Sequence, residues 1–454
     1  MIVIFFILIV ISLPFFIGGR PLTIPELMWM VVGERMSEGA TLYVDVWSNI
    51  SPFSASAYWL IDAVFGRSHL VYQIAGLVLV IIQSAIFNNT MLQFKAYNEN
   101  NYIPAFIYML LMTSHFDFFT LSPLLMSMTI LLHVMHLLFG YIQMRVKDDE
   151  MLLKIGVYLG VAVLFYLPVF LIVIVILLSL LFFTGVSVRR ILLLFYSFFL
   201  PLLIVGAYYY FKDGTKAFFI QYLFSYFNLK SEYLISLRAL LIISIIPAIF
   251  LILSVLKVFG SLGFTNFQVR IQQMMLMFLM IGGFVFLLSQ KKTPYQLAIF
   301  VPPAAFFISH FFLLIKRRLW TELSFGIFFL SIVIINWGAY FNNSLVNLTG
   351  SEKLLLQESS LDQVVKDKRI LVLGDDISLY QNAKLATPYF DWKLAKSHFE
   401  NLDYYDNITA IFRNLTNDPP DLIIDKGDLM PTLSDKIPIL KTNYTKSGPV
   451  YRKR

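Results

Sequence analysis

Cysteine is absent from this 454-residue chain, and charged residues make up only 14% of it. Without cysteine the chain can form no disulfide, no thiolate metal site and no cysteine nucleophile. An average soluble domain carries about 25% charged residues, so the low charge excludes an ordinary cytosolic enzyme. A disordered chain and a nucleic-acid-binding domain both depend on charge, and they are excluded for the same reason.

The chain is instead rich in hydrophobic residues. They make up 58% of the chain, which contains 44 Phe and 24 Tyr, and the mean hydropathy is +0.74. These values predict a polytopic membrane protein. The net charge of +7 then reflects Lys and Arg at membrane boundaries, and we expect no nucleic-acid partner.

Eleven apolar runs have lengths that suit membrane spans. The first, residues 1–17, has no basic flank and no cleavage site, which favours a retained span over a removed signal peptide. Two others, 102–115 and 151–166, are short and could be half-spans. The sequence therefore predicts a polytopic α-helical protein with about eleven transmembrane helices. The other runs lie near residues 70–90, 119–142, 168–184, 190–211, 236–259, 271–288, 295–315 and 321–341.

Lys and Arg in the short connections predict the orientation. With a cytoplasmic N-terminus, the outside connections 113–120 and 166–168 hold no Lys or Arg, and Lys291 and Lys292 are the main exception. The odd number of spans then places the C-terminal segment outside, on the same face as loop 19–69. The predicted inside connections hold Lys95; Arg145, Lys147 and Lys154; Arg189 and Arg190; Lys257 and Arg270; and Lys316, Arg317 and Arg318.

The loop 19–69 carries clear local signals. Thr23 can cap a helix, and Glu26 stands three residues later as in a capping box. The helical period continues to Glu38, where Glu34 and Arg35 complete what we predict to be a solvated charged face. An extended segment follows, and residues 54–65 are predicted to be helical again.

The remaining polar parts are the loop 212–235, predicted to be an interfacial amphipathic helix, and the tail 350–454. In the tail, strands near 368–373 and 419–425 flank a helix near 403–415, with short strands near 441–444 and 450–452. We therefore expect a transmembrane domain, 1–349, followed by a small extracytoplasmic α/β domain, 350–454. Only one glycine follows the first strand, so a nucleotide fingerprint is missing.

Several segments occur in a characteristic order. The first loop contains Gly39-Ala40-Thr41-Leu42-Tyr43-Val44-Asp45, then Pro52, then Phe65-Gly66-Arg67-Ser68, and residues 292–303 introduce a late span. This order resembles the GT-C superfamily of membrane glycosyltransferases, especially its protein mannosyltransferase and aminoarabinose transferase branch. The tail resembles the small external α/β domain that many bacterial members carry.

The resemblance implies an inverting transfer reaction on the external, periplasmic face of a bacterial inner membrane. A sugar would leave a polyprenyl-phosphate carrier and join an acceptor hydroxyl, amine or lipid. A first-loop carboxylate would act as general base, which makes Glu26 and Asp45 the candidate catalytic residues. The leaving phosphate needs cationic or backbone donors. The candidate substrate-binding residues are Asp117, Arg238, Lys291, Lys292 and Tyr295.

Each candidate also has an ordinary structural interpretation. Glu26 could simply cap its helix. Asp45 could bind the acceptor or a metal, and its structural interpretation is a carboxylate that stabilises a turn. Arg238 and the two lysines could snorkel to the membrane surface. His115 and Asp117 could face one ion, but a structural metal site usually needs four ligands. No cofactor is assigned, and a divalent metal stays open.

A second hypothesis belongs to another class. Pro25 and Ser122 stand where members of the resembled family commonly have acids. The chain could therefore be a non-catalytic GT-C-like subunit that scaffolds a membrane or periplasmic protein complex through its external loop and tail. A secondary transporter is disfavoured, because we find no inverted repeat and few charges within the spans.

Overall fold

The computed structural model describes residues 2–17, 22–144, 148–228, 231–341, 354–356 and 359–454. The chain forms two compact units, which we call the helical unit and the loop–tail unit. Residues 18–20, the cations Arg145 and Lys147, and the predicted domain boundary at 349–350 lie outside the described residues. The helical unit comprises Met1–Pro21, Leu70–Val205 and Lys230–Leu354, and the loop–tail unit comprises Leu22–His69, Gly206–Leu229 and Leu355–Arg454.

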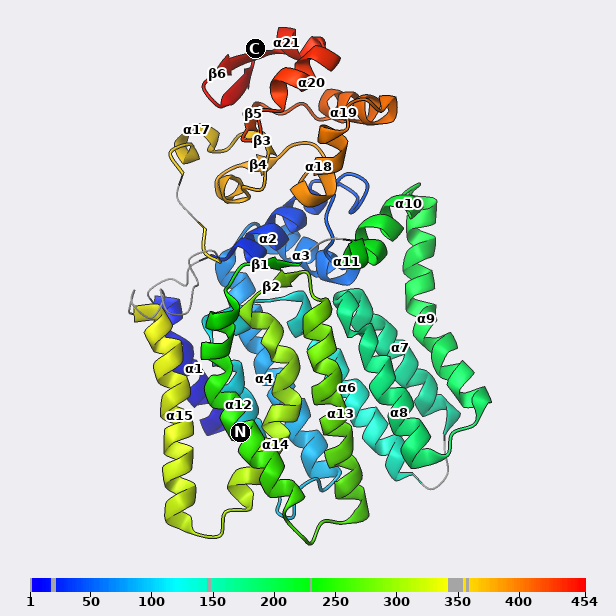
Figure 1. The fold of residues 1–454 in the computed structure, drawn as a ribbon, viewed down its shortest axis with the longest axis vertical. Coiled ribbons are helices and arrows are strands. Elements are labelled where there is room, and N and C mark those ends of the chain that lie inside the picture. Colours follow the sequence, from blue (N-terminus) through cyan, green and yellow to red (C-terminus); the bar gives the residue numbers. More distant parts are fainter. Residues whose placement is uncertain (1, 18–21, 145–147, 229–230, 342–353, 357–358) are drawn as a thin grey trace. The chain divides into compact units, whose positions relative to one another are not determined.

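Every predicted apolar run coincides with a helix of the structure (Figure 1). Within the described residues, eight helices are long and apolar enough to cross a membrane. Three more are shorter, namely α1 (Ile2–Ile17), α5 (Ile103–Met112) and α7 (Asp149–Phe165). The eight are α4 (His69–Gln93), α6 (Pro123–Gln143), η2 with α8 (Leu167–Leu171, Ile172–Thr184), α9 (Val188–Phe211), α12 (Leu237–Phe259), α13 (Asn266–Leu288), η4 with α14 (Pro294–Phe300, Val301–Leu313) and α15 (Arg318–Phe341).

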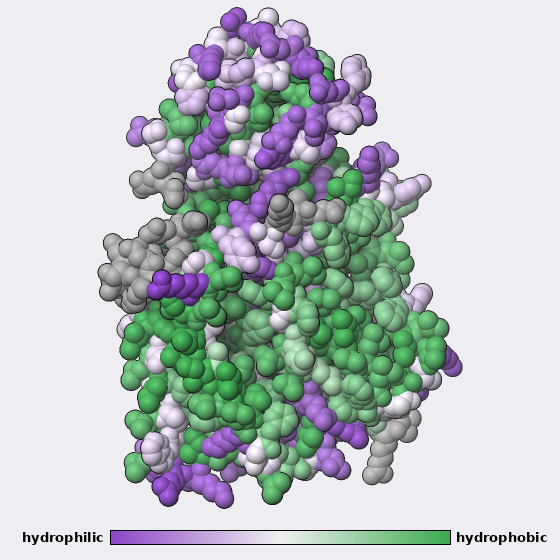
Figure 2. Space-filling model, viewed as in Figure 1, coloured by the Kyte–Doolittle hydropathy of each residue, from purple (hydrophilic) through white to green (hydrophobic). Residues whose placement is uncertain are grey.

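Local sequence signals set where these helices begin. Ser122 and Ser236 cap α6 and α12 through their hydroxyl groups, and Thr265 forms a capping box with Gln268 at the start of α13. Long apolar side chains cover the outer faces of the helices, as the continuous hydrophobic surface in Figure 2 shows. Such a surface requires lipid, because water would not tolerate so large an apolar area.

A short parallel sheet joins two connections of the helical unit. Strand β1 (Glu232–Tyr233) precedes α12, and β2 (Lys291–Lys292) precedes η4, with Glu232 paired to Lys291 and Tyr233 to Lys292. The sheet therefore places the predicted lysines beside the segment that leads to Arg238.

The tail folds around a five-stranded sheet of order β4-β3-β5-β7-β6. β4, β3 and β5 are parallel, while β7 and β6 are antiparallel additions. The predicted strands near 368–373, 419–425 and 450–452 and the helix near 403–415 are confirmed within three residues at their ends. The strand predicted at 441–444 is wrong for residues 441–443, which end the helix α21, and the strand β6 begins at Tyr444. The elements are α17 (Asp362–Val365), β3 (Arg369–Leu373), η6 (Ser378–Gln381), β4 (Lys384–Leu385), α18 (Trp392–Glu400), α19 (Tyr405–Asn417), β5 (Leu422–Asp425), α20 (Met430–Lys436), α21 (Ile439–Asn443), β6 (Tyr444–Ser447) and β7 (Val450–Lys453).

The first loop belongs to the same compact unit as the tail. Its helices α2 (Ile24–Ser37) and α3 (Pro52–Phe65) pack closely at Gly33, where an added Cβ would lie 2.7 Å from the Tyr58 carbonyl oxygen. Trp47 exchanges backbone hydrogen bonds with the 388–391 segment and packs into the core of the tail. The short helices α10 (Thr215–Phe218), η3 (Phe219–Phe224) and α11 (Ser225–Asn228) complete the unit.

Candidate functional site

Glu26 lies in the first turn of α2 and is fully buried. Its Oε2 accepts hydrogen bonds from the Thr23 backbone N–H and hydroxyl at 3.2 and 3.0 Å, while its own N–H donates to Thr23 Oγ1. The predicted capping box is therefore confirmed. His69 Nε2 lies 3.4 Å from the same carboxylate oxygen. This pairing has no signal in the sequence, because the two residues are 43 positions apart and no motif links them.

The segment after α2 is predicted to be extended, but residues 43–45 form a turn, in which Asp45 is exposed. Its carboxylate accepts a hydrogen bond from the Thr41 backbone N–H at 2.8 Å, which closes a tight turn. Tyr43, within this turn, has a φ of 69°. A short polar side chain that bonds to nearby backbone commonly stabilises such turns. The turn-stabilising role is thus present, and the exposed carboxylate still faces solvent.

Residues of the 206–228 segment stabilise the turn that carries Asp45 by hydrogen bonds and ring packing. Gln221 is buried; its amide N–H donates to the Tyr43 carbonyl at 2.8 Å, and its amide oxygen accepts from the Ser48 N–H at 3.2 Å. The Tyr43 ring packs against the rings of Tyr209 and Tyr222. Because these residues are far apart in sequence, spacing alone gave no signal for them.

The charged face predicted on α2 is not solvated. Arg67 Nη1 lies 3.3 Å from the Glu34 carboxylate and also donates to the Ala383 carbonyl of the tail. Burial raises the pKa of Glu34, and the neighbouring Arg67 opposes that rise. For Glu38 burial also favours the neutral form, but hydrogen bonds from Lys384 and Arg35 outweigh it and lower the pKa.

Asp418 of the tail forms ion pairs with the remaining charged residue of α2, Arg35, and with Arg369. Its carboxylate pairs with Arg35 of α2 and with Arg369 of β3, the latter at 3.2 Å, and accepts the Thr387 N–H at 3.1 Å. The predicted solvated face is therefore wrong: these groups form ion pairs between the first loop and the tail. The sequence pattern could not reveal partners more than 300 residues away.

In the helical unit, two predicted residues come together. Asp117 lies in the 3₁₀ turn η1 (Phe116–Phe119) and is fully buried. Its Oδ2 accepts a hydrogen bond from the Tyr295 backbone N–H at 2.9 Å, and its own N–H donates to His115 Nδ1 at 3.1 Å. The described residues contain no group of three or more potential metal-ligating side chains, so His115 and Asp117 stand as a pair.

Lys292 is buried at the carboxyl end of α13. Its ammonium donates to the carbonyl oxygens of Phe286, Leu287 and Ser289, at 2.5 to 2.8 Å. A lysine has three N–H donors, so binding a phosphate here requires release of at least one carbonyl. Burial lowers the pKa of Lys292 to about 8. Lys291 is half-buried beside it, whereas Arg238 is exposed at the start of α12.

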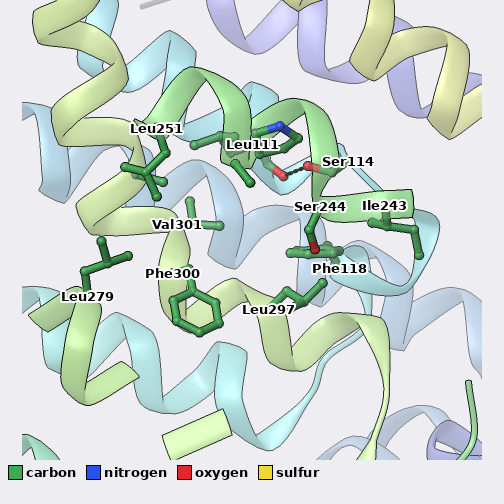
Figure 3. Close-up of a pocket in the computed structure, with 13 residues that line it drawn as sticks. Leu111, Ser114, Phe118, Ile243, Ser244, Leu251, Leu279, Leu297, Phe300 and Val301 are labelled. Atoms are coloured by element: carbon green, nitrogen blue, oxygen red, sulfur yellow. Dashed lines mark hydrogen bonds between the residues drawn. The ribbon is translucent and has the colours of Figure 1, made fainter. Parts of the chain in front are cut away.

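An apolar cavity of about 290 Å³ lies within the helical unit, between α5, η1, α12, α13, η4 and α14 (Figure 3). Two serines are the polar side chains in its wall. Ser114 donates its hydroxyl to the Leu111 carbonyl, and Ser244 donates to the Leu240 carbonyl. Phe118 of the wall directly follows Asp117, and Leu297 stands two residues after Tyr295. The lining suits a hydrocarbon chain, because its polar groups are already satisfied within the protein.

Comparison with solved structures shows that the fold is GT-C-like, as the order of the first-loop segments predicted. The similar structures are those of ArnT, an aminoarabinose transferase, from Cupriavidus metallidurans. The form bound to undecaprenyl phosphate has a TM-score of 0.56 and 11% sequence identity, and the apo form 0.54 and 12%. Both alignments cover 96% of this chain and 93% of the other. No protein-family profile and no curated protein sequence matches the chain.

Proposed function

We propose that this protein is a membrane glycosyltransferase that moves a sugar from a polyprenyl-phosphate carrier to an acceptor on the external face of a bacterial inner membrane. The observation that carries the proposal is the GT-C-like fold over 96% of the chain, similar to a protein solved with undecaprenyl phosphate. Because a fold can host several functions, the site must support the same conclusion. In this proposal the N-terminus is cytoplasmic and the loop–tail unit is periplasmic.

The apolar cavity supports a lipid-linked donor. Its wall offers hydrocarbon contacts throughout, and the buried polar residues Asp117 and Tyr295 belong to the same turns as two of the residues that line it. A prenyl chain in this cavity would bring its phosphate toward the polar turns of the helical unit. We propose that Arg238 and Lys291 bind that phosphate. Lys292 is less suited, since its ammonium already donates hydrogen bonds to three carbonyl oxygens.

The Glu26–His69 pair supports acid–base chemistry. Glu26 is fully buried, whereas the His69 side chain is 23% exposed. We therefore propose that the acceptor proton passes to His69 and that the Glu26 carboxylate orients the imidazole and stabilises its charge. Asp45, exposed on its rigid turn, would hold the acceptor by a hydrogen bond.

The test uses variants that separate chemistry from folding. Glu26→Gln keeps a residue type that completes a capping box but removes the charge, and Asp45→Asn keeps an acceptor for the Thr41 N–H. With purified protein in nanodiscs and a radiolabelled polyprenyl-phosphate sugar, Glu26→Gln and His69→Gln should each lose about 100-fold or more of the transfer rate. Asp45→Asn should lose about tenfold or more, the effect of one hydrogen bond to a charged group. Glu322→Gln, on an exposed surface pair, is the matched control. Full activity of Glu26→Gln and Asp45→Asn would refute the assigned residues.

A second candidate function is a non-catalytic GT-C-like scaffold. It is favoured by one observation: two residues at expected catalytic positions already perform structural tasks. Glu26 completes a capping box, and Ser122 caps α6 by accepting the Leu125 N–H at 3.1 Å. A stoichiometric protein partner on purification, together with no binding of a lipid-linked sugar, would favour the scaffold over the enzyme.

A further inference from the structure

A hollow of about 470 Å³ lies at one end of the helical unit, where α12 ends and α14 passes into α15. None of the residues that line it takes part in the proposed reaction. α12 packs against both α14 and α15, so the hollow is bounded by helices on its sides. Figure 1 shows the three helices together, with the connection from α14 to α15 at their end.

Three cations from two separate segments line this hollow. Lys257 comes from the last turn of α12, and Lys316 and Arg317 come from the connection before α15. Within the part of the chain that the structure describes, no carboxylate lies within ion-pair distance of any of the three. By contrast, the next residue, Arg318, is paired with Glu322 at 2.7 Å and does not line the hollow.

The helix that follows increases the positive potential. Lys316 and Arg317 stand immediately before α15, a helix of 24 residues with no acidic residue in its first turn. The amino end of a helix carries a partial positive charge, which disfavours cations and favours an anion. Basic residues that only mark the cytoplasmic side need no such convergence. Here the charges gather around one concave surface, and none of the described residues that line it is acidic.

Two aromatic rings, together with Ile315 and Ser324, form the rest of the surface. The Lys257 ammonium lies 4.9 Å from the centroid of the Phe311 ring, and Trp320, which is 60% exposed, borders the hollow. Exposed Trp at the end of a transmembrane helix is typical of the level of lipid headgroups. The ligand that satisfies both features has a negative headgroup and an apolar tail.

We propose that this hollow binds the phosphate group of an anionic phospholipid of the cytoplasmic leaflet. Basic pockets between transmembrane helices bind acidic headgroups in this manner. Lys257, Lys316 and Arg317 contact the phosphate, and the acyl chains lie along the exposed apolar faces of α12 and α15. The hollow shares no residue with the proposed glycosyl transfer, whereas the choice of the cytoplasmic leaflet rests on the orientation given in the proposed function.

The test titrates phosphatidylglycerol into the purified full-length protein in detergent and follows its melting temperature. Phosphatidylcholine with the same acyl chains is the neutral control lipid. Arg317→Gln and Lys257→Gln should each require about fivefold more phosphatidylglycerol for half of the stabilisation, because one cation near a headgroup contributes about that factor. Arg317→Lys should retain most of the affinity.

Arg189→Gln is the matched control variant. Arg189 lies in the first turn of α9 on the same predicted face, is 87% exposed and does not line the hollow, so its loss should change the titration less than twofold. Three results would overturn the proposal: equal effects of Arg189→Gln and Arg317→Gln, equal stabilisation by phosphatidylcholine, or saturation of the effect by glycerol phosphate. The last result would assign the hollow to a soluble phosphate compound.

Discussion

Asp418→Asn tests the packing of the first loop into the same unit as the tail. The Asp418 side chain is 20% exposed, and it receives the guanidinium of Arg35, which is 12% exposed, and that of Arg369, which is 39% exposed. Removing one partner of a fully buried ion pair costs about 3–5 kcal/mol. Glu38 remains 3.1 Å from Arg35 and 3.7 Å from Arg369, and Arg369 is partly solvated. We therefore expect a smaller loss, about 2–3 kcal/mol.

The assay is hydrogen–deuterium exchange on α2 in nanodiscs, supported by thermal unfolding. A loss of about 2–3 kcal/mol corresponds to roughly 30- to 150-fold faster exchange through local opening. Asp435→Asn is the control, because Asp435 pairs with Lys441 on an exposed surface and such pairs contribute about 1 kcal/mol or less. Equal exchange of α2 in the two variants would show that the ion pairs with the tail do not hold the first loop.

Three further predictions concern the helical unit. Gly76→Ala should destabilise the protein by about 1–3 kcal/mol, because the new Cβ would lie 2.0 Å from the Phe119 carbonyl oxygen, close to Asp117. Gly283→Ala is the control, since Gly283 has open space around it. A thermal melt should show no such loss for this control. Lys292→Met should lower stability by about 1–3 kcal/mol, since it leaves carbonyl oxygens of α13 without their donor; an unchanged melting temperature would contradict this. Burial lowers the pKa of Lys292 from 10.5 to about 8, so between pH 8 and pH 10.5 the unfolded chain binds more protons than the folded chain. The wild type should therefore gain stability relative to Lys292→Met as the pH rises from 8 toward 10.5. Parallel stability curves of the two proteins over this pH range would refute the lowered pKa of Lys292.

Local patterns carried the sequence predictions that the structure confirms. The capping box of Thr23 and Glu26 needs only two residues three positions apart, and the strand at 369–373 follows from a short apolar run. The apolar runs likewise predicted the helices, because lipid selects length and composition directly. These features depend on neighbours in sequence and therefore show in a single chain.

The rest depends on contacts between distant segments. The residues next to Trp47 in the sequence do not indicate that its ring centroid lies 5.0 Å from that of Tyr389. Those next to Arg35 likewise do not indicate its ion pair with Asp418. Lys292 is instructive, because its position before a late span suggested a phosphate ligand, whereas the path of the chain after α13 directs its ammonium to backbone carbonyls. Such outcomes depend on how the chain turns, which residue spacing does not specify.

The central claim is that the protein binds a polyprenyl-phosphate carrier in its helical unit. The most direct measurement is a cryo-EM map of the full chain in nanodiscs supplied with polyprenyl phosphate. We predict an elongated density in the cavity lined by Leu251, Leu297 and Phe300, with its phosphate near Arg238 or Lys291. A cavity that stays closed at saturating lipid, in a protein that carries a docked partner on its external face, would contradict the claim and support the scaffold function.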